Sequence, residues 1–315
     1  MKAIILKESG SVDNLIHTEI PKPILKENEV LVKVKSISIN PVDVKARRNE
    51  GVLSWIYNEE RPVVLGWDIS GEIIEKKETV KDFQLGDNVF GMVNFIGNGK
   101  AYAEYVAVPA NQLALKPENI SHEAAAAATL AALTAWQALV TNGNVSKGQR
   151  ILIHAGSGGV GHFAIQIAKH LGAYVITTSS LKNKEFVLSL GADEHIDYQN
   201  ETFNTKLKEI DLVLDTIGGD VLFQSIDVVK PNGSIISLPS PNFDDKTIEK
   251  AKKSNVDLDF ILVQSNGDDM KSIAHLLEKG IIKSHVFENY SFEDMDKAHL
   301  QVETGRTIGK VIVSL

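Results

Sequence analysis

The segment RILIHAGSGGVGHFAIQIAKHLGA, residues 150–173, is the most informative stretch of this 315-residue chain. An apolar strand pattern runs into the glycine-rich turn Gly156–Gly161, and an amphipathic helix pattern continues to Leu171. Glycines permit a tight bend, a close approach of the backbone to a phosphate, and close packing of the helix on the strand. The N-terminus of the helix attracts anions. The segment therefore predicts a dinucleotide-binding turn.

Two other interpretations of this turn are possible. A purely structural tight turn is the simpler one, and a nucleophile elbow at Ser157 would need a partner histidine and acid placed by a different fold. A second strand pattern at residues 173–180 favours the dinucleotide interpretation. The expected cofactor-binding residues of the turn are Gly156, Ser157, Gly158, Gly159, Val160 and Gly161.

Strand and helix patterns alternate on both sides of this turn. Further apolar strand patterns occur at HIDY (195–198), DLVLDTIG (211–218) and GSIISLP (233–239), with helix patterns between them. This alternation is typical of a doubly wound parallel sheet. The sequence thus predicts an α/β fold for the middle of the chain.

The N-terminal part has a different pattern. Residues 29–39, 71–77 and 102–108 form short alternating or apolar runs between turn residues, which predicts an antiparallel, partly closed barrel. At Ser121 a long alanine-rich helix begins with a serine cap. We expect the tail after Asn266 to return to the first domain.

These patterns set the predicted domain boundaries. Residues 1–120 with 266–315 form the substrate domain, and residues 121–265 form the cofactor-binding domain.

Composition narrows the possible functions. With 43% hydrophobic and 23% charged residues the chain is globular, and its net charge of −8 gives no basis for coating a nucleic acid or an anionic membrane. The absence of cysteine excludes disulfides, thiolate metal ligands and cysteine nucleophiles. The apolar run Ala3–Leu6 is too short for a signal peptide. We expect a cytoplasmic protein with a small-molecule substrate.

The end of the second strand indicates which dinucleotide binds. NAD enzymes usually carry an acid there to hold the ribose hydroxyls, but no carboxylate appears here until Glu185. The residues expected to bind a 2′-phosphate are Ser179, Ser180, Lys182 and Lys184, so NADPH is favoured. The alternative is that the two lysines are ordinary solvent-exposed residues. Tyr198 is expected near the adenine. The alternative is that it is a core residue or a residue at the rim of the core.

Several segments together resemble the medium-chain dehydrogenase/reductase superfamily, specifically its zinc-free quinone oxidoreductase branch. The segments that carry this resemblance are SINPVDVKAR (38–47), VLGWDISGEI (64–73), FQLGDNVFG (83–91), AYAEYVAVP (101–109), LTAWQAL (133–139), HAGSGGVGHFAIQIAK (154–169) and GKVIV (309–313). The resemblance implies a GroES-like, partly closed barrel built from both chain ends and a Rossmann domain between them. It also implies an active site in the cleft and commonly a homodimer paired through residues 257–264.

The chain departs from the zinc-dependent members of that superfamily. Those members place a cysteine at the position of Asn40, a Gly-His-Glu at Gly66-Trp67-Asp68, and a four-cysteine structural lobe in the substrate domain. A catalytic zinc needs about three protein ligands, and these residues do not supply them. We therefore expect no metal. His154, beside the glycine turn, is interpreted as a buried residue with a satisfied nitrogen.

Without a metal to polarise a simple ketone, a conjugated enone or a quinone is the favoured acceptor, because it spreads the charge of an added hydride onto oxygen. The expected catalytic residues are Asn40, Tyr57 and Thr129, and Asn40, Thr134, Ser237, Leu238 and Lys310 are expected to contact or border the cofactor. Most of these residues have a simpler alternative. Asn40 is then a turn residue before Pro41, and Tyr57 is a packing aromatic residue. Thr129 and Thr134 are then bonded to their own helix, and Lys310 caps the cleft.

Two other functions remain open. One is zinc-dependent alcohol oxidation. The other is a nucleotide-binding protein with little catalysis, against which the complete glycine turn argues.

Overall fold

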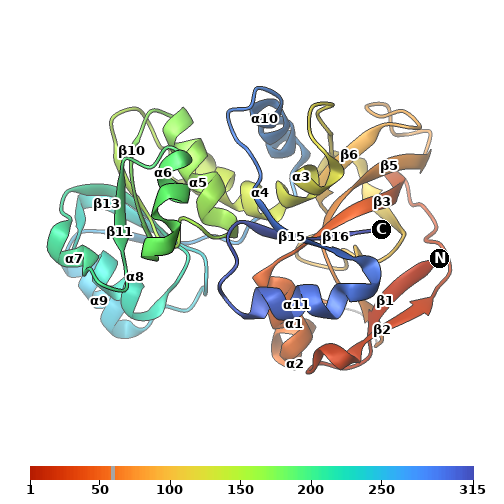
Figure 1. Ribbon diagram of the computed structural model, residues 1–315, viewed down its shortest axis with the longest axis horizontal. Coiled ribbons are helices and arrows are strands. Elements are labelled where there is room, and N and C mark those ends of the chain that lie inside the picture. Colours follow the sequence, from red (N-terminus) through yellow and green to blue (C-terminus); the bar gives the residue numbers. More distant parts are fainter. Residues whose placement is uncertain (58–60) are drawn as a thin grey trace. The chain divides into compact units, whose positions relative to one another are not determined.

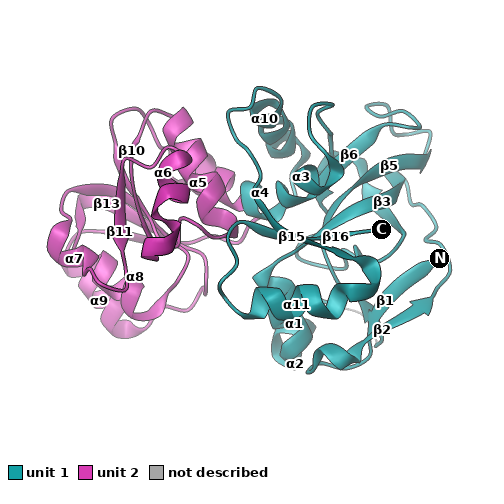
Figure 2. Ribbon diagram, viewed as in Figure 1, with its two compact units in different colours: residues 1–133, 264–315 teal, residues 134–263 magenta. Residues whose placement is uncertain are grey.

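The structure is a computed structural model that describes residues 1–57 and 61–315. The chain divides into two compact units (Figure 2). Unit 1 comprises residues 1–133 and 264–315, and unit 2 comprises residues 134–263. Unit 2 is thus continuous in sequence, whereas unit 1 is assembled from both ends of the chain.

Unit 2 contains a six-stranded parallel sheet whose strands are labelled in Figure 1. The strands are β9 (Arg150–Ile153), β10 (Tyr174–Ser179), β11 (Glu194–Asp197), β12 (Ile210–Asp215), β13 (Val229–Ser237) and β14 (Asp257–Phe260), and their order in the sheet is β11-β10-β9-β12-β13-β14. The order reverses direction between β9 and β12, as in the doubly wound dinucleotide-binding fold. The predicted Rossmann sheet is confirmed.

Helices connect these strands. They are α5 (Gly159–His170), α6 (Lys184–Ser189), α7 (Phe203–Lys206), α8 (Gly219–Ser225) and α9 (Asp245–Lys253). Apolar side chains from four neighbouring strands, Leu152, Ile176, Val213 and Ile235, are buried together in the core. Such continuous burial is typical of parallel strands covered on both faces.

Unit 1 is built mainly from a seven-stranded sheet in which β3 is the central strand. Its strands are β3 (Glu29–Ile39), β5 (Asp68–Lys76), β6 (Asn88–Met92), β7 (Tyr105–Pro109), β8 (Ala114–Leu115), β15 (Val286–Ser291) and β16 (Lys310–Ser314). β3 pairs with β5 along one edge and with β7 and β16 along the other. A separate three-stranded sheet has the order β2-β1-β4, with β1 (Lys2–Leu6), β2 (Leu15–Glu19) and β4 (Val63–Val64). These two open sheets agree with a partly closed barrel.

The helices of unit 1 include α1 (Pro41–Arg48), α2 (Glu50–Ile56), α3 (His122–Ala127), α10 (Gly267–Glu278) and α11 (Met295–Glu303). α1 directly follows β3, and α11 precedes β16. The C-terminal tail therefore joins the sheet that the N-terminal part begins. None of the described helices is long and apolar enough to cross a membrane.

The alanine-rich helix differs from the single helix expected from Ser121. The Ser121 side chain does cap it, because its Oγ accepts the N–H of Ala124 at 3.2 Å. The helix is nevertheless divided into α3, α4 (Leu130–Trp136) and a π-helical end at Gln137–Asn142. At the break, Thr129 Oγ1 donates to Ala126 O at 2.6 Å, and the N–H of Leu130 donates to Asp68 Oδ1 at 3.0 Å. One local and one long-range hydrogen bond therefore accompany the break in a segment whose alanines favour a continuous helix.

Candidate functional site

The glycine-rich turn connects β9 to α5 in unit 2. The N–H of Gly156 donates to Thr178 O, and the N–H of Gly158 to Ala155 O, both at 2.9 Å. A Cβ on Gly156 would lie 1.9 Å from Thr177 Oγ1, and one on Gly161 would lie 2.3 Å from Ala155 O. Only glycine fits at these two positions, because any side chain would collide with the neighbouring strand or with the turn itself.

The first turn of α5 offers unused hydrogen-bond donors. No side chain caps this helix, and among the described residues the amides of Gly159, Val160 and Gly161 have no acceptor. Ser157 Oγ accepts a hydrogen bond from Asn183 Nδ2 at 2.9 Å, so its own proton remains available. Helix N-termini with free amides bind phosphate. The turn therefore fits a dinucleotide pyrophosphate.

Polar residues gather where β10 ends. Ser179 Oγ donates to Ser180 O at 3.2 Å and lies 2.9 Å from His195 Nε2. Both serines are largely buried, whereas Lys182 and Lys184 are exposed. These four residues lie within one short segment at the carboxyl end of β10.

One carboxylate missed by the sequence reading lies opposite Ser179 in the sheet. Asp197 ends β11 in register with Ser179. It accepts hydrogen bonds from the Asn200 side chain at 2.6 Å and from the N–H of Gln199 at 3.2 Å, and the Asn200 amide lowers the pKa of Asp197. The carboxylate of Asp197 is therefore engaged in hydrogen bonds within the turn that follows β11.

Large apolar side chains are exposed just after β10, β11 and β12; β10 and β11 are neighbours in the sheet, and β9 lies between β10 and β12. Leu181 follows β10, Tyr198 follows β11 and Ile217 follows β12, with exposed fractions of 59%, 62% and 51%. Exposed apolar residues at the carboxyl edge of such a sheet suit a flat aromatic ring. The sequence predicts a place near the adenine for Tyr198 but not for Leu181 or Ile217. The position of these two residues, two residues after the end of a strand, is the signal that could have indicated such a role.

Asp215, at the end of β12, is a second residue that the sequence reading missed. It is buried and accepts hydrogen bonds from the N–H groups of Ile217 and Gly218, at 3.0 and 2.9 Å. Ser237 Oγ donates to its Oδ2 at 2.7 Å, and the N–H of Leu238 donates to its carbonyl oxygen at 2.9 Å. Asp215 thus fixes the ends of β12 and β13.

Unit 1 contains a buried polar cluster around Asn40, which separates β3 from α1. Asn40 Nδ2 donates to Asp68 Oδ2 at 2.8 Å, and the N–H of Asn40 donates to Asp43 Oδ2 at 2.8 Å. Lys310 Nζ donates to Asn40 Oδ1 and, at 3.3 Å, to Ile39 O. The sequence reading expected Asn40 and Lys310 at the site, and the structure brings them into direct contact.

The charges of this cluster are strongly affected by burial. Burial, together with the charge of Asp68, raises the pKa of Asp43 to about 7, although the N–H of Asn40 opposes the shift. Burial also raises the pKa of Asp68 and lowers that of Lys310, while the attraction between these two groups opposes both shifts. Burial therefore opposes the charged forms of all three groups, and the attraction between Lys310 and the two carboxyl groups offsets part of that effect.

Tyr57 lies in an aromatic group. It is buried, and its ring centroid lies 5.4 Å from that of Trp67, which contacts Phe95 at 5.2 Å. Trp67 Nε1 donates to Gly97 O at 2.8 Å. This arrangement matches the alternative of a packing aromatic. Residues 58–60, which follow Tyr57 in the chain, lie outside the described residues.

The two threonines and His154 occupy buried positions. Thr129 bonds to its own helix, as described above, and Thr134 in α4 is 6% exposed. Both ring nitrogens of His154 lie within hydrogen-bond distance of hydroxyls, those of Thr178 and Ser225, and burial lowers its pKa to about 4. Among the described residues, no group of three or more His, Asp and Glu side chains is arranged to hold a metal ion.

Comparison with known proteins agrees with this fold. Residues 26–118 match the family model of the alcohol dehydrogenase GroES-like domain, and residues 190–313 match the model described as zinc-binding dehydrogenase. The chain belongs to the medium-chain dehydrogenase/reductase superfamily, in its quinone oxidoreductase branch.

Individual relatives are similar over nearly the whole chain. The 2-methylene-furan-3-one reductase of Solanum lycopersicum and the chloroplastic NADPH-dependent alkenal/one oxidoreductase of Arabidopsis thaliana are each 34% identical, over 99% of this chain and 79% of theirs. The solved structure of the quinone oxidoreductase from Coxiella burnetii is 36% identical, with a TM-score of 0.93, over 100% of this chain and 99% of that one. These relatives confirm the family predicted from the sequence.

Proposed function

We propose that the protein is an NADPH-dependent, zinc-independent reductase that transfers hydride to quinones or to α,β-unsaturated carbonyl compounds. The observation that carries the proposal is the uncapped N-terminus of α5, with its free amides and the hydroxyl of Ser157. The names of the alkenal/one oxidoreductase and quinone oxidoreductase relatives support the acceptor class.

The cofactor would be held by unit 2. Gly156–Gly161 would bind the pyrophosphate, and Leu181, Tyr198 and Ile217 would contact the adenine. Ser179, Ser180, Lys182 and Lys184 would hold the 2′-phosphate through hydroxyl and ammonium donors. We assign residues 121–265 to the cofactor-binding domain and residues 1–120 with 266–315 to the substrate domain.

When bound, NADPH supplies the hydride. The chain's own residues would hold and orient the acceptor's carbonyl, and a water molecule would protonate the product. Ser237, Leu238 and Thr134 would border the nicotinamide. The packing of Tyr57 against Trp67 favours a role for Tyr57 in shaping the acceptor pocket.

We further propose a cytoplasmic homodimer that pairs through β14. This strand ends the sheet order of unit 2, and its residues Asp257–Phe260 are exposed or only partly buried. Edge strands of this kind readily pair with a second copy. Sedimentation of the purified protein tests the dimer.

The central experiment measures loss of NADPH absorbance with a quinone and, separately, with an alkenal. Turnover with either acceptor is expected, together with tighter binding of NADPH than of NADH in calorimetry. Metal analysis of protein purified without added zinc should find less than stoichiometric zinc. Tight NADPH binding without turnover would favour a non-catalytic nucleotide-binding protein, and stoichiometric zinc would favour alcohol oxidation.

A further inference from the structure

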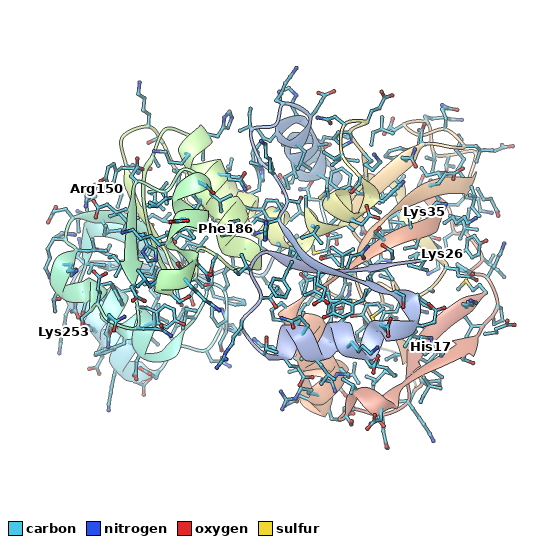
Figure 3. All side chains as sticks on the ribbon, viewed as in Figure 1. His17, Lys26, Lys35, Arg150, Phe186 and Lys253 are labelled. Atoms are coloured by element: carbon cyan, nitrogen blue, oxygen red, sulfur yellow. The ribbon has the colours of Figure 1, made fainter. Side chains whose placement is uncertain are left out.

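Asn183 is a buried asparagine between β10 and α6 of unit 2. It is 7% exposed and directly precedes α6, the helix whose Phe186 is labelled in Figure 3. Its Nδ2 donates to Ser157 Oγ at 2.9 Å. Its Oδ1 is buried and accepts no hydrogen bond from any of the described residues. A buried acceptor without a donor is unfavourable, so this oxygen requires an explanation.

The oxygen of Asn183 does not serve the helix that follows it. Asparagine at the N-cap of a helix normally combines an extended backbone with a side-chain oxygen that accepts an N–H of the first turn. Asn183 has φ −101° and ψ 4°, and its side chain makes no such hydrogen bond. The contact of its nitrogen with Ser157 instead directs the side chain toward the glycine-rich turn.

Asn183 joins the two groups of residues that are proposed to bind phosphates. Ser157 belongs to the glycine-rich turn, which precedes the uncapped N-terminus of α5. Ser180 and Lys184 belong to the same short segment as Asn183, and the N–H of Asn183 donates to Ser180 O at 2.9 Å. Direct hydrogen bonds therefore connect Asn183 to both the expected pyrophosphate site and the expected 2′-phosphate site.

The covalent structure of NADPH determines which group lies between these two sites. The adenosine ribose carries the pyrophosphate on its 5′-carbon and the additional phosphate on its 2′-carbon. The 3′-hydroxyl is the hydroxyl that remains on this ring. Ionised phosphate oxygens accept hydrogen bonds, as the amide oxygen does, whereas a hydroxyl can donate to that oxygen. The 3′-hydroxyl is thus the complementary partner for Asn183 Oδ1.

We propose that Asn183 recognises the adenosine ribose of the cofactor, with its Oδ1 accepting the 3′-hydroxyl while its Nδ2 keeps the hydroxyl proton of Ser157 available for the pyrophosphate. This inference rests on the proposed function. A single amide then contacts the ribose and orients a phosphate ligand. Asn183 is a binding and positioning residue and takes no part in hydride transfer.

Calorimetry with half of the cofactor tests the inference without turnover. The probes are adenosine 2′,5′-bisphosphate and its 3′-deoxy analogue, which differ only in the hydroxyl that Asn183 is proposed to bind. The wild type should bind the 3′-deoxy analogue about three- to tenfold more weakly, as expected for the loss of one hydrogen bond between uncharged groups. Asn183→Leu should bind the two probes equally, because leucine has no acceptor.

Asn183→Asp provides a readout that a merely structural role would not give. Its carboxylate still accepts the 3′-hydroxyl, but it cannot donate to Ser157 and it repels both phosphates. This variant should therefore bind both probes more weakly than the wild type and still prefer the probe with the hydroxyl. Asn255→Leu is the matched control, because Asn255 is exposed and its Nδ2 also donates to one side chain, that of Asn232. It should match the wild type with both probes.

Each result leads to a decision. Equal binding of the two probes by the wild type would overturn the inference, and so would a preference that persists in Asn183→Leu. If the leucine variant does not fold, Asn183→Asp decides instead, and loss of the preference there overturns the inference. Failure of the wild type to bind either probe would contradict the proposed cofactor as well. NADPH turnover with equal binding of the probes would overturn this inference alone, so the two failures are distinguishable.

Discussion

The phosphate turn of unit 2 and the polar cluster of unit 1 are built in opposite ways. The turn occupies one short segment, and its geometry follows from glycines that are adjacent in sequence. The cluster joins residues that are 28 positions apart, as in Asn40 and Asp68, or 270 apart, as in Asn40 and Lys310. A local site is readable as a motif, whereas a site assembled by sheet pairing becomes visible only in the fold.

The strongest expected effect falls on the local site. Gly161→Val places a side chain where even a Cβ would lie 2.3 Å from Ala155 O, so the turn must open. We expect NADPH binding to become undetectable by calorimetry, with a lower melting temperature. Ser189→Val, at the exposed end of α6, is the control and should bind NADPH as the wild type does. Equal binding by wild type and Gly161→Val would disprove the assignment of the turn.

The second prediction concerns the stability of the cluster. Lys310 and Asp68 are both buried, attract each other and are joined through the side chain of Asn40. Removing one of two buried opposite charges typically costs about 3–5 kcal/mol, because the other charge is left without compensation. We expect Lys310→Met and Asp68→Asn each to lower the free energy of unfolding in urea by an amount of this order. The double variant should lose clearly less than the sum of the two. Strict additivity would mean that the two groups do not interact.

The third prediction returns to unit 2 and concerns the choice of cofactor. Ser180→Asp adds a carboxylate at the end of β10, where the neighbouring acid Asp197 is already engaged by its own turn. Repulsion should weaken NADPH binding by about 10-fold or more and leave NADH binding nearly unchanged. Calorimetry with both dinucleotides measures this. Ser189→Asp, on the exposed end of α6, is the control and should change neither affinity.

The smallest expected effect is a pH dependence in unit 1. The pKa of Asp43 is raised from 3.8 to about 7, so the folded state binds this proton more tightly than the unfolded state does. Stability from this group is therefore present below about pH 4 and is lost as the pH rises toward about 7. Asp43→Asn keeps an oxygen to accept the N–H of Asn40 and cannot ionise.

Melting temperatures of wild type and Asp43→Asn measured between about pH 5 and about pH 8 test this prediction. The variant should gain stability relative to the wild type as the pH rises. A constant difference across that range would show that Asp43 does not titrate there.

The sequence predicted the elements of unit 2 well, because each strand and helix has its own apolar pattern. It also indicated Asn40, Lys310 and the glycine turn. It did not predict the hydrogen bond between Asn183 and Ser157, the role of Asp215, or the break at Thr129. Each of these depends on a partner distant in sequence, such as Asp68 on β5, which accepts the N–H of Leu130 at the start of α4. No local propensity encodes such a partner.

The pairing of β3 also has a consequence for how the protein is made. On the side of β3 opposite β5, β7 pairs with the first half of the strand and β16 pairs with the second half. About 200 residues separate β7 from β16 in the chain. At about 5–20 residues per second, ribosomal synthesis therefore leaves the second half of β3 without this partner for roughly 10–40 s. Unit 2 has no such delay. We therefore expect the nascent N-terminal strands to be the part of this polypeptide that most needs a chaperone.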